Sequence, residues 1–298
     1  MEEDIYRTDV PFRGTYRLQR LRFGRGHPHL VVVAGLHGNE LNAIYAVNLL
    51  ASALRAQAPA GTVDLIPLAN AFGVEEGRKL GPFDDQDLNQ SFPGRPDGSA
   101  TERVAYALLE ATCADVCVDV HSGSPLMDEL PQVRLPLEGP ELQLGRAMGL
   151  PLVWRRPTRP LDDSQLVGAW RKRGCSALRV TGGRGGTLDK PTGLEVANGI
   201  RRLMAHLGMG AAPRPGQLLG DVSDEEVEVV RGDMGGFFVP EVSVGERVSR
   251  GFLLGRTIAP VGGESLEEIH AAQDGVVMTL RRYPMVHAQE LLLRIACL

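Results

Sequence analysis

Buried-looking apolar runs and helical patterns alternate along the first two thirds of the chain. Residues 30–33 are consecutive apolar residues, typical of a buried strand, and from residue 40 apolar positions recur at helical spacing to about residue 54. The same pattern predicts further strands at 63–68, 116–120, 132–135, 151–154 and 175–181, and further helices at 100–112, 140–149, 164–174 and 190–207. This alternation predicts an α/β domain with a mixed, mostly parallel sheet and helices on both faces.

Two other segments of this part lack a helical period. Residues 15–23 alternate between polar and apolar side chains, which indicates a strand at the edge of the sheet. Residues 70–98 are rich in Gly, Pro and Asp and show no periodicity, so they are expected to form a long loop. Loops of this length in compact domains are usually functional or disordered.

The pattern changes near residue 210. From Val227 onward the chain consists of short β-type runs separated by glycine, without long helical patterns. We therefore expect two domains, an α/β domain over residues 1–210 and a small all-β barrel or sandwich over residues 211–298.

Composition narrows the class of protein. The 298 residues are 43 % apolar and 23 % charged with a net charge of −5, which is ordinary for a soluble protein. No basic stripe indicates nucleic-acid binding, and no apolar run approaches the roughly 20 residues that cross a bilayer. The acidic N-terminus differs from a signal peptide, so a cytoplasmic location is expected. Cys113, Cys117, Cys175 and Cys297 form no CxxC pair and are expected to be reduced core residues.

Candidate chemistry follows the predicted strands at 30–33 and 116–120. His37 and Glu40 come after the first strand, and His121 comes directly after the second. Parallel strands present polar groups at their carboxyl ends, so these three side chains can meet at one sheet edge. Two imidazoles and one carboxylate suit Zn²⁺ and leave a coordination position open, as in catalytic zinc sites. Asp119 either orients one of these ligands or makes a structural hydrogen bond.

Three ordered motifs carry a family resemblance. Gly35-Leu36-His37-Gly38-Asn39-Glu40, Asp87-Leu88-Asn89-Gln90-Ser91-Phe92-Pro93-Gly94 and Asp119-Val120-His121-Ser122-Gly123 resemble the succinylglutamate desuccinylase/aspartoacylase family of the zinc carboxypeptidase superfamily. Thr101-Glu102-Arg103 and the β-rich tail extend the likeness to roughly residues 30–298. The resemblance implies a zinc carboxypeptidase-like fold, one zinc ion per chain, and hydrolysis of an amide bond in a small, carboxylate-bearing N-acyl compound.

The resemblance also implies roles for individual residues. His37, Glu40 and His121 match the family's zinc ligands. Arg78 falls where the family places an arginine that polarises the scissile carbonyl, although it can equally be a solvated loop residue. Asn89 matches an asparagine that holds the substrate carboxylate, and Gln90, Arg95 or Arg179 are expected to assist it.

The sequence departs from the family pattern at two positions. Gln90 stands where the family has an arginine, so it lacks both the charge and the bidentate fork. Thr181 stands where the family has the glutamate that moves the proton, and a threonine cannot act as a general base near neutral pH. Asp128, Glu129 and Glu195 are the open candidates for a replacement.

Arg179, two residues before Thr181, points to the same strand face. It either holds a substrate carboxylate or pairs with a carboxylate of the protein. The two departures also leave an alternative function open, in which the protein retains zinc and binds a small ligand or partner without hydrolysis.

The β-rich tail resembles the fold of biotinyl and lipoyl carriers. Such carriers are modified on a lysine, yet the last lysine of this chain is Lys190. The tail is therefore expected to shape the mouth of the active site or to form a homo-oligomer contact. The expected partner of the whole protein is a small molecule, without nucleic acid or membrane.

Overall fold

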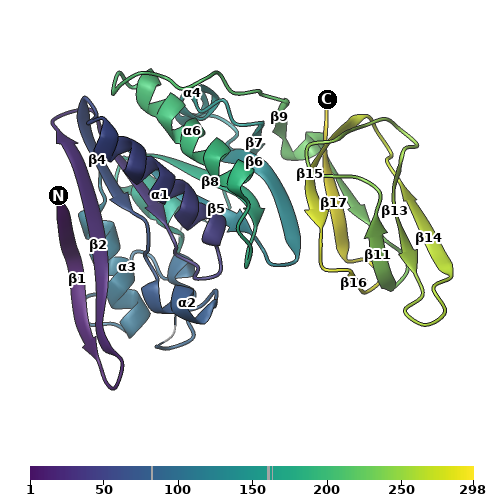
Figure 1. Cartoon of the computed structure of the whole chain (residues 1–298), viewed down its shortest axis with the longest axis horizontal. Helices are drawn as coiled ribbons and strands as arrows, with labels where there is room; N and C mark the ends of the chain where they lie inside the picture. The colour runs from purple at the N-terminus through teal and green to yellow at the C-terminus, as the bar shows by residue number, and fades with distance from the viewer. Residues whose placement is uncertain (82, 160–161, 163) are drawn as a thin grey trace.

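Residues 1–81, 83–159, 162 and 164–298 are described by a computed structural model of the chain (Figure 1). Within them, a 13-stranded sheet follows the order β1-β2-β4-β3-β5-β8-β6-β15-β17-β10, with β7, β9 and β12 attached at its side. The strands of its first part are β1 (Glu2–Val10), β2 (Gly14–Arg25), β3 (His29–Ala34), β4 (Gly61–Ile66), β5 (Val116–Gly123), β6 (Met127–Pro136), β7 (Leu152–Arg156) and β8 (Ser176–Arg184).

The centre of this sheet is parallel. β3 pairs in parallel with β4 and β5, and β5 pairs in parallel with β8, whereas β6 runs antiparallel to β8. The helices are α1 (Leu41–Ala56), α2 (Ala71–Glu76), α3 (Ala100–Ala111), α4 (Glu141–Ala147), α5 (Leu166–Lys172) and α6 (Lys190–His206), with a 3-10 turn at Leu88–Gln90. The expected mixed α/β class is confirmed.

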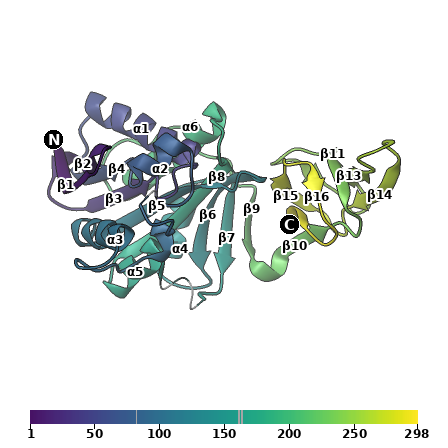
Figure 2. The ribbon, with the colours of Figure 1, turned by 90° about the horizontal axis from the view of Figure 1, so that it is seen from below.

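Helices cover both faces of the parallel centre (Figure 2). Each central strand is buried on both sides, so alternate side chains face opposite cores. Val32 contributes to the core under α1, α4 and α6, whereas Val31 and Val33 contribute to the core under α3 and α5, around Trp170. This two-sided burial explains why the strand sequences are continuously apolar.

The predicted edge strand is wrong. The strand that contains residues 15–23, β2, pairs with β4 on one side and with β1 on the other, so β1 forms the edge. The outer strand is largely exposed, with an acidic start that gives no apolar alternation. Exposed edges carry charged side chains in natural sheets, and this is why the pattern of β1 is weak.

The predicted long loop at 70–98 is also wrong in part, because it contains α2 and the 3-10 turn. The Asn70 side chain caps α2 by accepting a hydrogen bond from the Gly73 N–H at 3.0 Å. Gly77 ends the helix in the left-handed region at φ 65°. A helix of six residues is too short to show a helical period, which is why the sequence pattern did not predict it.

The last third of the described chain forms strands and one 3-10 turn, Asp224–Glu226. The strands are β9 (Gly220–Ser223), β10 (Val227–Arg231), β11 (Gly236–Pro240), β12 (Arg247–Val248), β13 (Leu253–Ile258), β14 (Ser265–His270), β15 (Gly275–Arg281), β16 (Met285–Val286) and β17 (Leu291–Cys297). A four-stranded sheet, β14-β13-β11-β16, packs against β10, β15 and β17 around Phe238 and Leu254.

This β-rich part is joined to the α/β part through backbone pairing. β15 pairs with β6 and extends the long sheet, and β9 pairs in parallel with β7 (Figure 1). The predicted boundary between residues 210 and 211 falls between α6 and β9 and stays a prediction. Among the described helices, none combines the length and the apolar character needed to span a membrane.

Candidate active site

The ends of β3 and β5 bring the two predicted histidine ligands together. Ala34 pairs with Val120, so the loop after β3 lies beside the last residues of β5. His37 lies in that loop and His121 in β5, and their ring centroids are 5.3 Å apart. The two strands therefore end side by side at one edge of the sheet, as expected, and bring the two histidines together.

Glu40 lies between the two imidazoles. His37 Nδ1 lies 2.7 Å from Glu40 Oε1, and His121 Nδ1 lies 2.8 Å from Glu40 Oε2. All three residues are buried, and one potential metal-ligand atom from each lies within 4.8 Å of the other two. Burial alone raises the pKa of Glu40, but His121 and His37 lower it to about 2, so the carboxylate is held in its charged form.

Each imidazole is held from behind by an aspartate. His37 Nε2 donates to Asp87 Oδ1 at 2.9 Å, and His121 Nε2 donates to Asp119 Oδ2 at 2.7 Å. Burial lowers the pKa of His37, but Asp87 and Glu40 outweigh it and raise the pKa to about 9. Carboxylates behind imidazoles are also the usual outer partners of histidine metal ligands. Asp119 thus contacts His121, and its role in orienting a zinc ligand stays a prediction.

Sequence reasoning assigned no role to Asp87 or Lys79. Asp87 opens the quoted Asp87-Leu88-Asn89-Gln90 motif, and that motif was the available signal. Lys79 Nζ lies 2.8 Å from Asp87 Oδ2. Its side chain lines a pocket that is also lined by His37, Glu40 and His121. Lys79 lies in the aperiodic segment at residues 70–98, where neither the apolar pattern nor the spacing of residues indicated that its side chain faces the pocket.

Thr181 and Arg179 lie beside the histidine strand. In β8, Thr181 pairs with His121 and Arg179 pairs with Asp119. The Thr181 hydroxyl is buried and has no hydrogen-bond partner among the described residues. Arg179 NH2 is 3.6 Å from Asp119 Oδ2, so Arg179 pairs with a carboxylate of the protein while it also lines the pocket.

Asn89 and Gln90 also line the pocket, with their amide oxygens engaged. Asn89 Oδ1 accepts from the Leu166 N–H at 3.2 Å, and Gln90 Oε1 accepts from the Ser164 hydroxyl at 2.9 Å. The contacts join the start of α5, and the residue two positions before it, to the motif. The substrate-binding roles of the two amides stay predictions.

Arg78 and Arg95 do not belong to the described pocket lining. Arg78 is 43 % exposed and pairs with Glu76 and Asp85, because it follows the left-handed Gly77 that turns the chain after α2. Arg95 pairs with Glu102 at the start of α3. The fold thus brings Lys79, and not the adjacent Arg78, to the described pocket. The roles predicted for Arg78 and Arg95 stay predictions.

The pocket has a volume of about 310 Å³ and a second buried carboxylate, Glu129. Glu129 Oε2 accepts from Gln132 Nε2 at 2.7 Å and from Arg134 NH2 at 2.5 Å. The other candidate proton carriers lie outside the described lining: Asp128 pairs with Arg282, and Glu195 pairs with Arg202 on α6.

Comparison with known proteins identifies the family of the chain. The catalytic-domain profile of the succinylglutamate desuccinylase/aspartoacylase family matches residues 26–207. The chain is 30 % identical over 285 residues to the N-alpha-acetyl-L-2,4-diaminobutyric acid deacetylase of Halomonas elongata, covering 86 % of this chain and 78 % of that protein.

Solved structures share the fold over nearly the whole chain. The product-bound ectoine utilization protein EutE (DoeB) of Ruegeria pomeroyi has a TM-score of 0.81 at 22 % identity, covering 100 % of this chain and 95 % of that one. An aspartoacylase family protein of Mesorhizobium loti has a TM-score of 0.76 at 25 % identity, covering 96 % and 91 %. The chain belongs to the succinylglutamate desuccinylase/aspartoacylase family.

Proposed function

We propose that the protein is a zinc-dependent deacylase that hydrolyses the amide bond of a small N-acyl amino acid or a related compound. The observation that carries this proposal is the convergence of His37, Glu40 and His121 within 4.8 Å at the floor of a pocket. Membership of the family and the deacetylase activity named for the Halomonas relative support it.

The donor set fits zinc. Two imidazole nitrogens and one carboxylate form a ligand set that leaves a coordination position open, and the aspartates behind the imidazoles hold both rings in place. When bound by these residues, a zinc ion supplies Lewis acidity and lowers the pKa of water toward neutrality.

Glu129 is the residue that we assign to proton transfer. Both of its hydrogen bonds end on Oε2, so Oε1 remains to take a proton and to return it to the leaving amine. Thr181, at the position of the family glutamate, cannot do this. The neighbouring strand β6 thus provides the carboxylate that β8 lacks, since Glu129 pairs with Gly183 of β8.

Cationic side chains of the pocket orient the substrate. Arg134 and Arg179 both line it, and a guanidinium binds a carboxylate through parallel hydrogen bonds. Lys79 brings a further positive charge beside Asp87, where an oxyanion that develops during acyl transfer is stabilised.

The alternative function is retention of zinc with loss of hydrolysis. It is favoured by one observation, the threonine that lies directly beside His121. In that case the pocket binds a small anion without turnover.

Hydrolysis of a panel of N-acetyl and N-succinyl amino acids by the zinc-loaded protein separates the two. We expect activity that His121→Ala abolishes. We expect Glu129→Gln to lower kcat by about 10²–10⁴ at unchanged zinc content. Asp128→Asn is the matched control, because Asp128 is the preceding carboxylate and pairs outside the pocket with Arg282.

Each other outcome has a defined meaning. Activity that survives His121→Ala does not arise at this site. Full activity of Glu129→Gln removes Glu129 from the mechanism. A protein that retains zinc and turns over no member of the panel supports the binding function.

A further inference from the structure

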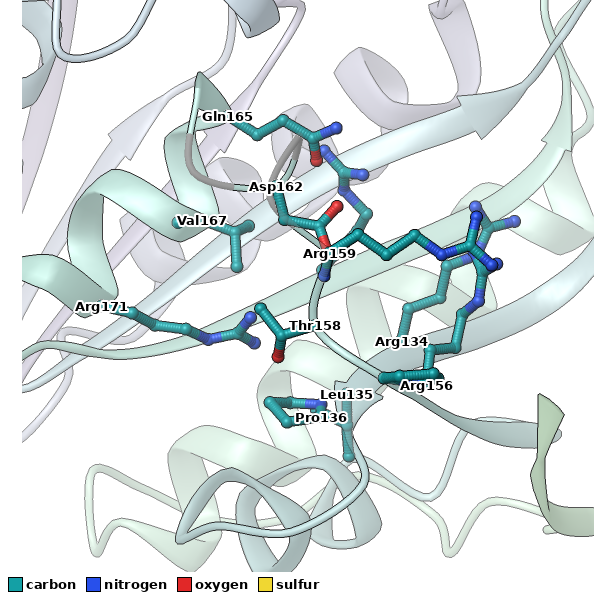
Figure 3. Close-up of a pocket in the computed structure, with 13 residues that line it drawn as sticks. Arg134, Leu135, Pro136, Arg156, Thr158, Arg159, Asp162, Gln165, Val167 and Arg171 are labelled. Atoms are coloured by element: carbon teal, nitrogen blue, oxygen red, sulfur yellow. The ribbon is translucent and has the colours of Figure 1, made fainter.

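A second cavity, of about 260 Å³, lies beside the metal pocket and is lined with arginine (Figure 3). Its arginines come from four separate elements or their flanks and are Arg134, Arg156, Arg159, Arg171 and Arg179. In the part of the lining that the structure describes, Asp162 is the one acidic residue. We call this space the arginine cavity.

Three of the guanidinium groups gather on one side (Figure 3). Arg156 donates to Asp224 at 2.9 Å and Arg159 lies 3.7 Å from the same carboxylate. Arg134 and Arg156 both lie over the ring of Trp154, at 5.1 and 4.3 Å from its centroid. Asp224 serves two of these arginines and Glu129 serves Arg134, so two carboxylates face three guanidinium groups and one positive charge is in excess on this wall.

Arg171 reaches in from α5 (Figure 3). Arg179 belongs to β8 and lines the same cavity. Burial lowers the pKa of Arg171, and the nearby charge of Arg179 lowers it further, against the opposing effect of Glu141. Arg171 Nε, Arg179 Nε and Arg179 NH2 are buried without a hydrogen-bond partner among the described residues. Arg171 Nε and Arg179 NH2 have only long ion-pair contacts, at 3.8 Å to Glu141 and 3.6 Å to Asp119. Charged donors without a hydrogen-bond acceptor are costly to bury, and an anion between them supplies acceptors.

The arginine cavity and the metal pocket adjoin. Arg134, Gln165 and Arg179 line both. Arg179 lies 3.6 Å from Asp119, which itself binds His121. A ligand whose reacting end is at the histidines therefore has its far end within reach of the arginines.

We propose that the arginine cavity binds a phosphate group on the far end of the substrate. Only the statement that the phosphate is part of the substrate rests on the proposed function; binding of phosphate in the arginine cavity does not depend on it. Phosphate oxygens point in tetrahedral directions and accept guanidinium forks from several walls, whereas a planar carboxylate accepts fewer. The same excess of positive charge disfavours a substrate whose far end is an ammonium group.

The first test is calorimetric titration of the zinc-loaded full chain with inorganic phosphate. Binding of one phosphate per chain is expected, weakened about tenfold or more by Arg171→Gln and by Arg159→Gln, because each removes charge-assisted hydrogen bonds. Arg256→Gln is the matched control, since Arg256 pairs with Glu241 and Glu268 far along the chain in β13. His121→Ala is included to detect phosphate bound at the metal ligands, and its affinity is expected to remain unchanged.

The proposal is overturned if phosphate does not bind, if both cavity variants bind phosphate with the affinity of the wild type, or if only His121→Ala loses affinity. Arg159 is 62 % exposed, so Arg159→Gln decides the question if Arg171→Gln does not fold.

The second test compares hydrolysis of N-acetyl-O-phosphoserine with that of N-acetylserine. The phosphorylated compound is expected to have a KM at least about tenfold lower, and Arg159→Gln is expected to remove the difference. Equal KM values contradict binding of the phosphate as part of the substrate. If neither compound is hydrolysed, the proposed function fails here, while the titration still decides what the arginine cavity binds.

Discussion

Replacement of Asp119 by asparagine tests whether the metal centre depends on the carboxylate behind His121. Asp119 is fully buried, and its Oδ2 accepts from His121 Nε2 at 2.7 Å. The substitution keeps the size of the side chain and removes its charge. A hydrogen bond to a charged group contributes about 1.5–3 kcal/mol, and loss of such an outer partner typically costs 10–100-fold in metal affinity, or about 1.4–2.7 kcal/mol.

We therefore expect Asp119→Asn to bind zinc at least about tenfold more weakly than the wild type, as measured by competition with a chromogenic chelator. Asp115→Asn is the matched control, because Asp115 precedes the same strand but is exposed and binds His27. A folded Asp119→Asn protein with zinc affinity within about twofold of the wild type refutes the role that we assign to this carboxylate.

Two further predictions concern the framework around the site. A Cβ at Gly38 would lie 2.0 Å from the Gly73 carbonyl carbon, and backbone cannot move aside as a side chain does. Gly38→Ala is therefore expected to lower the free energy of unfolding, measured in urea, by about 3 kcal/mol or more. A loss below about 1 kcal/mol contradicts this packing. Burial raises the pKa of Asp64, but hydrogen bonds from Arg22 and His29 lower it to about 2. Because the pKa of Asp64 is depressed in the folded state, the stabilisation by its carboxylate is present above about pH 4 and is lost as the pH falls toward 2. Allowing for the exposure of Arg22, we expect the stability difference between wild type and Asp64→Asn, measured by urea unfolding at each pH, to shrink by about 1–2 kcal/mol over this interval. A difference that stays constant with pH argues against the ion pair.

The arrangement of His37, Glu40 and His121 could be predicted because it follows from strand direction. Parallel strands end at the same sheet edge, and both strands are continuous apolar runs that can be recognised without tertiary information. The α/β class was predictable for the same reason, since most of its elements are long enough to show their period.

Glu129 could be named from the sequence but not distinguished from Asp128 or Glu195. Its strand, β6, runs antiparallel to β8 and reaches the pocket only through long-range pairing. The apolar pattern indicated only residues 132–135 of that strand, so the register that directs Glu129 inward was not visible.

The placement of Lys79 was not predictable either, for a different reason. It depends on α2, a short helix whose position is set by the close approach of Gly73 to Gly38. The arginine cavity is harder still, because its side chains are brought together from strands and a helix that no local pattern connects.

The backbone of Glu129 is clamped on both sides, by Gly183 of β8 and by Thr279 of β15. The β-rich part therefore holds in place the strand that carries the carboxylate to which we assign proton transfer. We therefore expect a substitution that weakens the pairing of Thr279 with Glu129 to change turnover without altering any residue that lines the pocket.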